Sequence, residues 1–439
     1  MLVTSLSVSA AESVWILKIQ GAIGPATADY VVRGLEDADE QGAHAVILAM
    51  DTPGGLDRAM RDIIQAIIAS PIPVIGYVEP SGARAASAGT YILYASHISA
   101  MAPATNLGAA TPVQIGAPGM PSSPDEPDPD SPSAEKSKQP STAMERKMIN
   151  DAVAYIRGLA ELRGRNAEWA ERAVTDAATL TAEQAREKNV VDLVASNTSE
   201  LLKLINGRVV TTEAGKVTLA TTDAEVSLHE PDWRYEFLSI ITDPNVAYIL
   251  LLIGIYGLIF EFSNPGMGGP GIIGAICLIT ALYALQVLPV SYSALALIVL
   301  GIGLMTAEAF SPSFGVLGVG GIIAFVVGSI MLMDTKLPAF QIAWPIILAL
   351  TAVSAGLLIL VLGMLLRYRR GPTVSGVSIL VGDVAQVITG QGEQLIVLVQ
   401  GERWQAICDQ PLQKGDYVRV LAVDGLKLSV TPMDNNSRE

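Results

Sequence analysis

The stretch His44-Ala-Val-Ile-Leu-Ala-Met50 is a continuous apolar run, and the turn sequence Asp51-Thr-Pro-Gly-Gly55 follows it directly. Apolar runs of this length are typical of strands that are buried on both faces, as in parallel sheets. Strands and helices alternate on both sides of this run. The predicted strands are Val14–Gln20 and Pro73–Val78, and the predicted helices are Thr27–Gln41 and Leu56–Ser70. This alternation predicts an α/β domain with a parallel or mostly parallel sheet.

We expect this domain to extend over residues 12–230. The sequence Ser81–Ala88 leads into a helix that we expect to run to about His97. Residues 116–141 are dense in proline and acidic residues and show no apolar periodicity, which predicts a disordered loop. The domain then closes with predicted helices at Ala143–Arg163 and Thr181–Asn189 and a predicted strand at Val190–Val194.

The composition indicates a membrane protein that also carries soluble domains. Half of the 439 residues are hydrophobic, 16% are charged, and the mean hydropathy is +0.43. The apolar excess is concentrated in residues 244–370, where the run lengths predict about five spans. These runs lie at 246–260, 271–288, 293–307, 314–333 and 343–366. The net charge of −15 argues against a nucleic-acid partner, because binding phosphates requires a cationic surface.

The membrane block contains a weak internal repeat. Glu261-Phe-Ser-Asn-Pro-Gly266 leads into a Gly-rich stretch, and Glu308-Ala-Phe-Ser-Pro-Ser-Phe-Gly315 does the same about 47 residues later. We interpret the block as two related units of helix, acidic corner and Gly-rich re-entry, with glycines that suit close helix packing. An ionisable side chain in a membrane segment can also indicate ion transport. Because both glutamates fall at helix ends beside proline or glycine, hydrogen bonding at a corner is the favoured interpretation.

Three features indicate how the chain meets the membrane. Residues 1–11 end in small residues suited to signal cleavage but lack a positive first segment, which predicts a partial signal peptide. Residues 231–243 predict an amphipathic helix in the membrane interface, with Trp233 and Tyr235 at headgroup depth. Arg367-Tyr-Arg-Arg370 follows the last apolar run, so the positive-inside rule places that end in the cytoplasm. With about five spans, the N-terminal domain is then extracytoplasmic.

Residues 374–433 return to short strands that are separated by glycine and aspartate. The predicted strands are Val384–Ile388, Leu395–Val399, Arg403–Ile407, Tyr417–Leu421 and Lys427–Val430. Five strands in about sixty residues are typical of a small closed barrel of the OB type. OB barrels often bind nucleic acid, but this segment has few aromatic residues and no basic cluster. We therefore expect an interaction module.

The sequence Ala85-Ala-Ser-Ala-Gly-Thr90 places Ser87 among small residues where a loop turns into a helix. The free N–H groups at a helix N-terminus can stabilise an oxyanion. Gly54 and Gly55 end a buried strand and let a backbone N–H face a ligand, as an oxyanion hole requires. We expect Gly54, Gly55 and Ala88 to form that hole, with the amides of Gly55 and Ala88 as the two donors. A helix N-cap at Ser87 and an ordinary turn at Gly54 are the alternative interpretations.

The histidines do not offer a general base for Ser87. His97 would lie roughly 15 Å away along the same predicted helix. His44 sits at the far end of a buried strand, and His229 lies outside the α/β region. The three histidines and two cysteines also show no metal-ligand spacing, so no metal or cofactor is expected.

A lysine is therefore the candidate base. Lysine can replace histidine when burial lowers its pKa from about 10.4 towards neutrality. Lys136 and Lys138 lie in the predicted disordered loop and would be solvated. Lys147 leads into the amphipathic segment 152–162, where burial is possible. We expect Ser87 and Lys147 to act together in nucleophilic acyl transfer.

Three stretches carry a family resemblance: Asp51–Gly55, Gly82-Ala-Arg-Ala-Ala-Ser-Ala-Gly89 and Lys147-Met-Ile-Asn-Asp-Ala-Val-Ala-Tyr-Ile-Arg157. They resemble the long NfeD family of membrane-bound serine proteases, whose protease domain is similar to ClpP and signal peptide peptidase A. The Glu308–Gly315 motif and the C-terminal barrel are similar to the rest of that family, although the acidic loop looks enlarged.

The resemblance implies a fold and a function. The fold would be a ClpP/crotonase-like α/β domain, an all-α polytopic membrane block and an OB-like NfeD barrel. The function would be that of a serine endopeptidase with a dyad on Ser87 and Lys147 that cleaves hydrophobic segments of membrane-associated proteins. The resemblance also implies a stomatin- or flotillin-like membrane partner and self-assembly into a homo-oligomer.

Two alternative functions belong to other classes of protein. The first is a catalytically inactive scaffold that organises a membrane assembly through the barrel. The joint presence of Ser87, Lys147 and the Gly54-Gly55 turn speaks against it. The second is a crotonase-like acyl-CoA enzyme, which shares the paired-amide oxyanion hole but needs no serine with a lysine partner.

Overall fold

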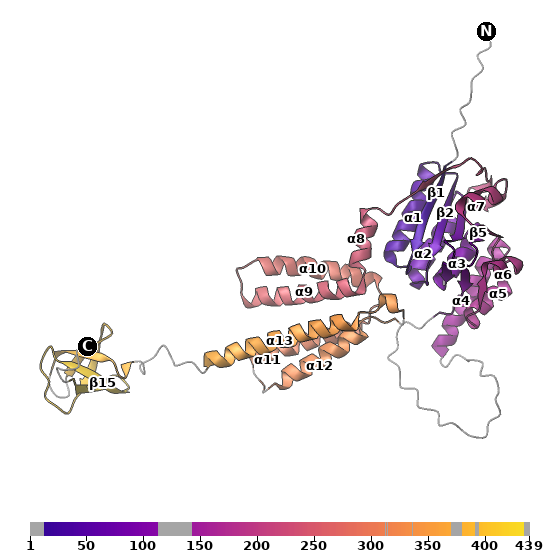
Figure 1. The fold of residues 1–439 in the computed structure, drawn as a ribbon. Coiled ribbons are helices and arrows are strands. Elements are labelled where there is room, and N and C mark those ends of the chain that lie inside the picture. Colours follow the sequence, from indigo (N-terminus) through magenta and orange to yellow (C-terminus); the bar gives the residue numbers. More distant parts are fainter. Residues whose placement is uncertain are drawn as a thin grey trace, which may run out of the picture. The chain divides into compact units, whose positions relative to one another are not determined.

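The structure is a computed structural model that describes residues 13–112, 143–311, 313, 315–335, 337–369, 380–390 and 395–433. The expected partial signal peptide at 1–11 and the acidic loop at 116–141 lie outside these residues. An α/β domain, a series of apolar helices and a β-barrel follow one another along the chain (Figure 1). This order confirms the predicted fold class.

A six-stranded parallel sheet forms the centre of the α/β domain, in the order β11–β1–β2–β3–β5–β8. Its strands are β1 (Ser13–Gln20), β2 (Ala45–Asp51), β3 (Val74–Val78), β5 (Ile98–Met101), β8 (Leu193–Val194) and β11 (Glu225–Leu228). β2 and β3 are buried along their whole lengths except at Asp51, the last residue of β2. Burial on both faces explains the apolar run that precedes the glycine turn. The prediction of a parallel sheet is confirmed.

Helices connect these strands, and smaller β elements lie beside the main sheet (Figure 1). The helices are α1 (Pro25–Glu40), α2 (Asp57–Ala69), α3 (Ala88–Ala95), α4 (Ala143–Arg163), α5 (Ala167–Thr175), α6 (Ala182–Glu187) and α7 (Thr198–Ile205). A three-stranded sheet contains β4 (Arg84–Ala86), β6 (Asn106–Gly108) and β7 (Thr179–Thr181), and a hairpin contains β9 (Val209–Thr212) and β10 (Gly215–Thr218). Thr181 and Gln184 form a capping box on α6, which confirms the predicted helix start.

One sequence prediction about this domain is wrong. The helix that starts at Ala88 ends at Ala95 and does not run to His97. Ser96 has an extended backbone, and β5 begins two residues later. Because β5 has only four residues, all of them buried, periodicity cannot separate it from the end of an apolar helix.

The helix α8 (Trp233–Ile241) joins the α/β domain to the membrane block and is docked on α1. Asp232 caps α8 by accepting a hydrogen bond from the N–H of Tyr235 at 3.1 Å. Arg33 of α1 donates to both carboxylate oxygens of Asp232, at 3.0 and 3.1 Å. This paired contact is the strong form of an arginine–carboxylate interaction, so it fixes the start of α8 on the domain.

The two aromatic residues expected at headgroup depth have different surroundings. Trp233 is 73% exposed and remains available to a membrane interface. Tyr235 instead packs edge-on against Tyr30 of α1, with ring centroids 5.4 Å apart. Trp233 and Tyr235 thus have different neighbours on α8, and the headgroup depth expected for the two residues stays a prediction.

The membrane block contains the helices α9 (Pro244–Ser263), α10 (Gly269–Val287), α11 (Tyr292–Phe310), α12 (Val316–Met331) and α13 (Trp344–Arg369). Within the described residues, four helical segments are long and apolar enough to cross a membrane: Pro244–Ser263, Gly269–Val287, Tyr292–Phe310 and Pro338–Val361. The fourth predicted run corresponds to α12, which has 16 residues and is shorter than these four.

Although α12 is short, it runs back along the whole of α11. At one end, the N–H of Ser291 donates to the carbonyl of Leu332 at 3.0 Å. At the other end, the N–H of Gly315 donates to the carboxylate of Glu308 at 3.0 Å. Between these ends the helices touch through glycine, because a Cβ added to Gly301 would lie 2.7 Å from the backbone of α12. α11 and α12 thus form an antiparallel hairpin, as α9 and α10 do (Figure 1).

The two hairpins repeat the same corner. Glu261 accepts hydrogen bonds from the amides of Gly268 and Gly271, seven and ten residues ahead. Glu308 accepts them from Gly315 and Gly318 at the same spacings. Each carboxylate therefore satisfies free amides at the start of the following helix. This geometry confirms the predicted repeat and the interpretation of both glutamates as corner residues.

The C-terminal strands close into a barrel in the order β12–β13–β14–β16–β15. The strands are β12 (Val384–Thr389), β13 (Leu395–Val399), β14 (Glu402–Ile407), β15 (Tyr417–Asp424) and β16 (Lys427–Pro432). Alternate residues point inward, and Ala385, Val397, Val418 and Leu428 are fully buried. Each predicted strand matches one of these five in order.

Candidate active site

Ser87 occupies a strained position between β4 and α3. Its backbone has a φ of 50° and a ψ of −116°, outside the helical region. Its N–H donates to the carbonyl of Gly108 at 3.0 Å, which fixes the turn. A non-glycine residue held in such a region stores about 1–3 kcal/mol of strain, and such positions cluster at active sites. The Ser87 hydroxyl makes no capping bond to α3, so the alternative role as an N-cap does not hold.

The glycine turn after β2 is packed directly against this serine. A Cβ added to Gly54 would lie 2.6 Å from the Cβ and 3.1 Å from the Oγ of Ser87. The approach is fixed by backbone hydrogen bonds between β2 and β4, from Thr52 to Arg84 at 2.7 Å and from Ala86 to Thr52 at 3.1 Å. The structure therefore joins the two sequence motifs at one site.

The three expected oxyanion-hole residues differ in what their amides do. The N–H of Gly54 donates to the hydroxyl of Thr52 at 3.0 Å, so this amide is occupied. The amides of Gly55 and Ala88 contact no acceptor among the described residues. Gly55 is held by a backbone bridge to Ile23, and an added Cβ there would lie 2.0 Å from the Ile23 carbonyl oxygen. Gly54 thus provides close approach, whereas Gly55 and Ala88 retain free donors.

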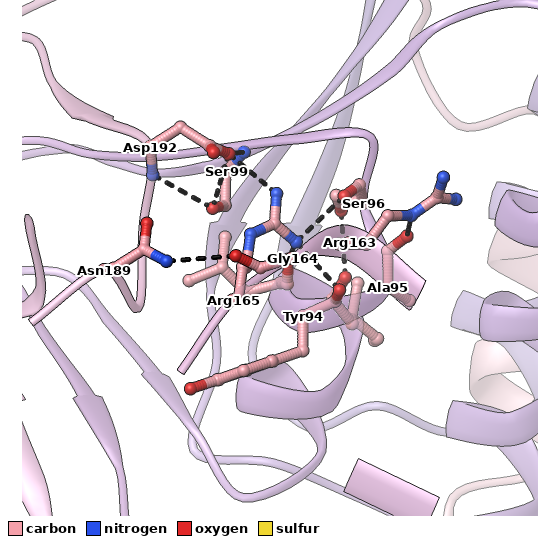
Figure 2. Close-up of polar contacts among 11 residues, drawn as sticks. Tyr94, Ala95, Ser96, Ser99, Arg163, Gly164, Arg165, Asn189 and Asp192 are labelled. Carbon is pink, nitrogen blue, oxygen red and sulfur yellow. Dashed lines mark hydrogen bonds and ion pairs between the residues drawn. The ribbon is translucent and has the colours of Figure 1, made fainter. Parts of the chain in front are cut away.

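A buried arginine, which no sequence motif singled out, fixes the far end of α3 (Figure 2). Arg165 is 6% exposed, and its Nη1 donates to carbonyl oxygens at the end of α3. The acceptors are Leu93 at 3.1 Å, Tyr94 at 2.8 Å and Ser96 at 3.0 Å. Carbonyl groups in the last turn of a helix lack helical partners, and a cation there is favourable. Arg165 therefore anchors the helix whose other end carries Ser87.

Asp192 balances the charge of this arginine. Its carboxylate lies 2.7 Å from Arg165 Nη2 and accepts hydrogen bonds from the N–H and hydroxyl of Ser99, at 2.7 and 3.0 Å (Figure 2). Burial alone raises the pKa of the Asp192 carboxyl. The Arg165 guanidinium and the Ser99 hydrogen bonds outweigh burial, so this pKa lies below its usual value. The pair is therefore charged at neutral pH.

Lys147 lies in the second turn of α4, and its side chain is exposed. The burial that the sequence allowed for this side chain is therefore absent in the isolated chain. α4 packs along α3 through a stack of Tyr155 on Tyr91, with ring centroids 6.1 Å apart. Further along, Arg163 Nε donates to the carbonyl of Ala95 at 2.8 Å. Since both contacts advance in the same direction along the two helices, the Lys147 end of α4 lies towards the Ser87 end of α3.

The histidines have structural environments. His97 is buried after α3 and accepts a hydrogen bond from the N–H of Val74 at 3.2 Å. Burial, together with two nearby arginines, lowers the pKa of His97 to about 3 and keeps the ring neutral. His44 accepts a hydrogen bond from a backbone amide at 2.9 Å. His229 stacks on Trp15 of β1 with centroids 4.7 Å apart, so it lies against the sheet and not outside the α/β region as expected.

Within the part of the chain that the structure describes, no group of three or more His, Cys, Asp or Glu side chains could hold a metal ion.

The similarity of nearly the whole chain to a membrane-bound protease gives the class as a membrane-anchored protease, and an α/β domain joined to apolar helices agrees with it. Comparison with known proteins identifies the family. Family models match for the NfeD1b N-terminal domain over residues 13–228 and the NfeD integral membrane domain over 245–365. A third model, the NfeD-like C-terminal, partner-binding domain, matches residues 377–432. The chain belongs to the NfeD family.

Two known relatives align along nearly their whole lengths. The chain is 34% identical over 427 residues to membrane-bound protease PH1510 of Pyrococcus horikoshii, covering 95% of this chain and 92% of the relative. It is 28% identical over 440 residues to membrane protein NfeD1b of Bacillus subtilis, covering 95% and 92%.

Solved structures of a related N-terminal domain are also similar. One is the 1510-N membrane protease specific for a stomatin homolog from Pyrococcus horikoshii, with 36% identity, 53% of this chain and 100% of that chain covered, and a TM-score of 0.43. Another is a lysine-to-alanine mutant of a 1510-N membrane-bound stomatin-specific protease in complex with a substrate peptide. It has 38% identity, 53% and 99% coverage, and a TM-score of 0.45.

Proposed function

We propose that this membrane-anchored protease is a serine endopeptidase with Ser87 as nucleophile and Lys147 as general base. The observation that carries the proposal is the strained φ of 50° at Ser87 in contact with the Gly54 turn, next to two amides without acceptors. Strain at a serine and donors held ready are the features that acyl transfer requires.

The proposed reaction follows from these groups. Lys147, as the neutral amine, takes the proton from Ser87 Oγ while the oxygen attacks a peptide carbonyl carbon. The oxyanion that forms accepts hydrogen bonds from the amides of Gly55 and Ala88. Lys147 then donates the proton to the leaving amine, and water attacks the acyl-enzyme with the same lysine as base. Both halves of the reaction use the same base and the same two donors.

We further propose that the substrate is a hydrophobic peptide segment of a membrane protein. The support is the exposure of Lys147 in the isolated chain. An apolar segment bound across the site would remove water from the lysine, and desolvation favours the neutral amine that can accept a proton. A polar peptide would leave the lysine solvated. Substrate and base would therefore depend on each other.

The partner of the proposed protease is a stomatin- or flotillin-like membrane protein. Its support is the match to a partner-binding domain at 377–432, together with 38% sequence identity to a protease described as stomatin-specific. We assign the partner contact to the barrel, and we expect the protease to act as a homo-oligomer.

The protease domain is proposed to be extracytoplasmic and the barrel cytoplasmic. Two observations support this orientation. α12 runs back along α11, and we infer from this that α12 also crosses the membrane, which would give the block an odd number of crossings. α13 then ends in basic residues up to Arg369, which the positive-inside rule places in the cytoplasm.

The proposed dyad can be tested on the purified full chain. Ser87→Ala and Lys147→Ala are each expected to lower hydrophobic-peptide cleavage by about 10³-fold or more, because members of a catalytic unit are not replaceable one at a time. A fluorophosphonate probe should label the wild type and not Ser87→Ala. Lys136→Ala and Lys138→Ala serve as matched controls that keep full activity. Wild-type protein that neither labels nor cleaves, or a Lys147→Ala variant that cleaves normally, would contradict the proposal.

A further inference from the structure

Arg61 of α2 faces charged and aromatic groups from two helices. Its Nε donates to Asp57 of the same helix at 2.9 Å, and its Nη2 donates to Asp151 of α4 at 2.8 Å. Its guanidinium carbon lies 4.4 Å from the centre of the Tyr155 ring, also on α4. A guanidinium over an aromatic face is attracted by the ring. Arg61 therefore holds α4 by an ion pair and a cation–π contact at once.

The same cluster reaches the nucleophile helix. Tyr155 stacks on Tyr91 of α3 at 6.1 Å, and Tyr91 is 5% exposed. Tyr91 follows Ser87 by four residues and lies in the first turn of α3, which begins at Ala88. The cluster thus connects the helix of the nucleophile with the helix of the base.

The position of this cluster along α4 is significant for Lys147. Asp151 follows Lys147 by four residues, which is one helical turn. Among the described residues, no hydrogen bond or ion pair joins α4 to the rest of the domain before Asp151. The first turns of α4 therefore project from the point at which Arg61 holds the helix.

Arg61 is also close to the oxyanion turn in sequence. α2 begins at Asp57, two residues after Gly55, and Arg61 lies in the second turn of this helix. Arg61 thus lies on the helix that follows the donor turn, contacts the helix of the base directly and is linked to the nucleophile helix α3 through Tyr155. Within the described part of the chain, Arg61 is the one side chain that joins α2 to α4 by an ion pair.

We propose that Arg61 is a positioning residue that sets the base helix α4, and with it Lys147, against Ser87. The inference rests on the proposed dyad. It adds an explanation of how a solvent-exposed lysine is held in position. The contacts of Arg61 with Asp57 and Asp151 are partly exposed, so they contribute little to global stability. The effect of Arg61 is therefore on geometry at the site, where a displacement of about 1 Å can lower the rate about 10²-fold.

The first test compares Arg61→Gln with Arg157→Gln in the full chain. Arg157 is a matched control because it also ties α4 to a neighbouring helix, by an ion pair to Glu171 of α5. Arg61→Gln is expected to lower kcat for a fluorogenic hydrophobic peptide by about 10-fold to 100-fold and to change KM by less than about 2-fold. Arg157→Gln should leave both constants unchanged. Equal kcat for Arg61→Gln and wild type, or equal losses in the two variants, would overturn the assignment.

The second test covers the case in which Arg61→Gln does not fold. Tyr155→Phe keeps the ring and should retain kcat, whereas Tyr155→Leu removes it and should lower kcat as Arg61→Gln does. Loss of activity in Tyr155→Phe, or none in Tyr155→Leu, would contradict the proposal.

A measurement without catalysis separates this inference from the proposed dyad. Spin labels at Ser87→Cys and Lys147→Cys, with Cys277 and Cys408 changed to Ser, report the distance between the two positions. Arg61→Gln is expected to broaden that distribution, and Arg157→Gln is not. If Lys147→Ala is fully active yet the distribution broadens, the dyad fails and the positioning stands. If the distribution is unchanged, the positioning fails whatever the activity.

Discussion

At the scale of single residues, the contact between Gly54 and Ser87 is the most restrictive feature of the candidate site. Gly54 has a φ of 105°, where a side chain is strained, and a Cβ there would lie 2.6 Å from the Cβ of Ser87. Both the backbone and the space require glycine. Gly82 offers a comparison, since it has a φ of 91° with no atom within 4 Å of an added Cβ.

Gly54→Ala is therefore expected to lower peptide cleavage by about 10²-fold or more, because it displaces the nucleophile. Gly82→Ala has the same kind of backbone strain without the collision, so it should keep its activity. The melting temperature should fall further for Gly54→Ala, because the collision adds to the backbone strain, and the peptide assay shows whether activity is lost as well. Equal activities would show that the Gly54 contact does not set the position of Ser87.

The sequence predicted part of this site. The small residues around Ser87 and the paired glycines were recognisable, because each is needed locally. The hydrogen bond that occupies the amide of Gly54 could not be recognised, because its acceptor is a threonine hydroxyl that a turn motif does not specify. Arg165 carried no signal either: its partners are backbone carbonyls about 70 residues away in the sequence. The exposure of Lys147 depends on what packs over the start of α4, which periodicity does not show.

At the scale of helices, the two glutamate corners share one hydrogen-bonding arrangement and differ in the number of donors. Glu308 is 1% exposed and accepts five hydrogen bonds, from Ser313, Gly315, Leu317 and Gly318. Glu261 accepts two. Removing an acceptor leaves each buried amide unsatisfied.

Glu308→Ala is accordingly expected to lower the thermal stability of the chain in detergent at least about twice as much as Glu261→Ala. The measurement is the melting temperature of each variant under one set of conditions. Glu308→Gln should lie between wild type and Glu308→Ala, because an amide oxygen still accepts some of the bonds. A larger loss for Glu261→Ala would show that donor number does not set the strength of a corner.

Element boundaries were predicted well where a pattern is long. α4 begins and ends at the predicted residues, and each barrel strand overlaps its prediction. The predictions are wrong or incomplete where an element is short, or where neighbouring elements determine which of its residues are covered. β5 was missed because four buried residues carry no period. The contact of Tyr235 with Tyr30 was not predicted, because the sequence of one helix does not show which residues cover its faces.

At the scale of the whole molecule, the order of domains could be derived from composition alone, since apolar runs and alternating strands differ over long windows. The orientation across the membrane depends on one short helix. If α12 crosses, as its return along α11 indicates, the two ends of the membrane block lie on opposite sides.

This orientation can be measured with a maleimide that does not cross membranes. Single cysteines are placed at Ser196→Cys in the protease domain and Ser429→Cys in the barrel, both exposed, with Cys277 and Cys408 changed to Ser. In intact cells the label is expected to reach position 196 and not position 429, while both react after lysis. Labelling of 429 alone would invert the orientation. Labelling of both or neither would mean an even number of crossings.

The docking of α8 on α1 limits the reach of the enzyme. Thr242 and Asp243 are the only residues between α8 and the first membrane helix, and the Arg33–Asp232 contact holds α8 to the domain. A connection of two residues keeps the catalytic centre close to the lipid surface. If Ser87 is the nucleophile, the height of a peptide bond above the bilayer helps to decide whether it is cleaved, in addition to the side chains next to that bond. A soluble protein carrying the same peptide in a distant loop would then escape cleavage.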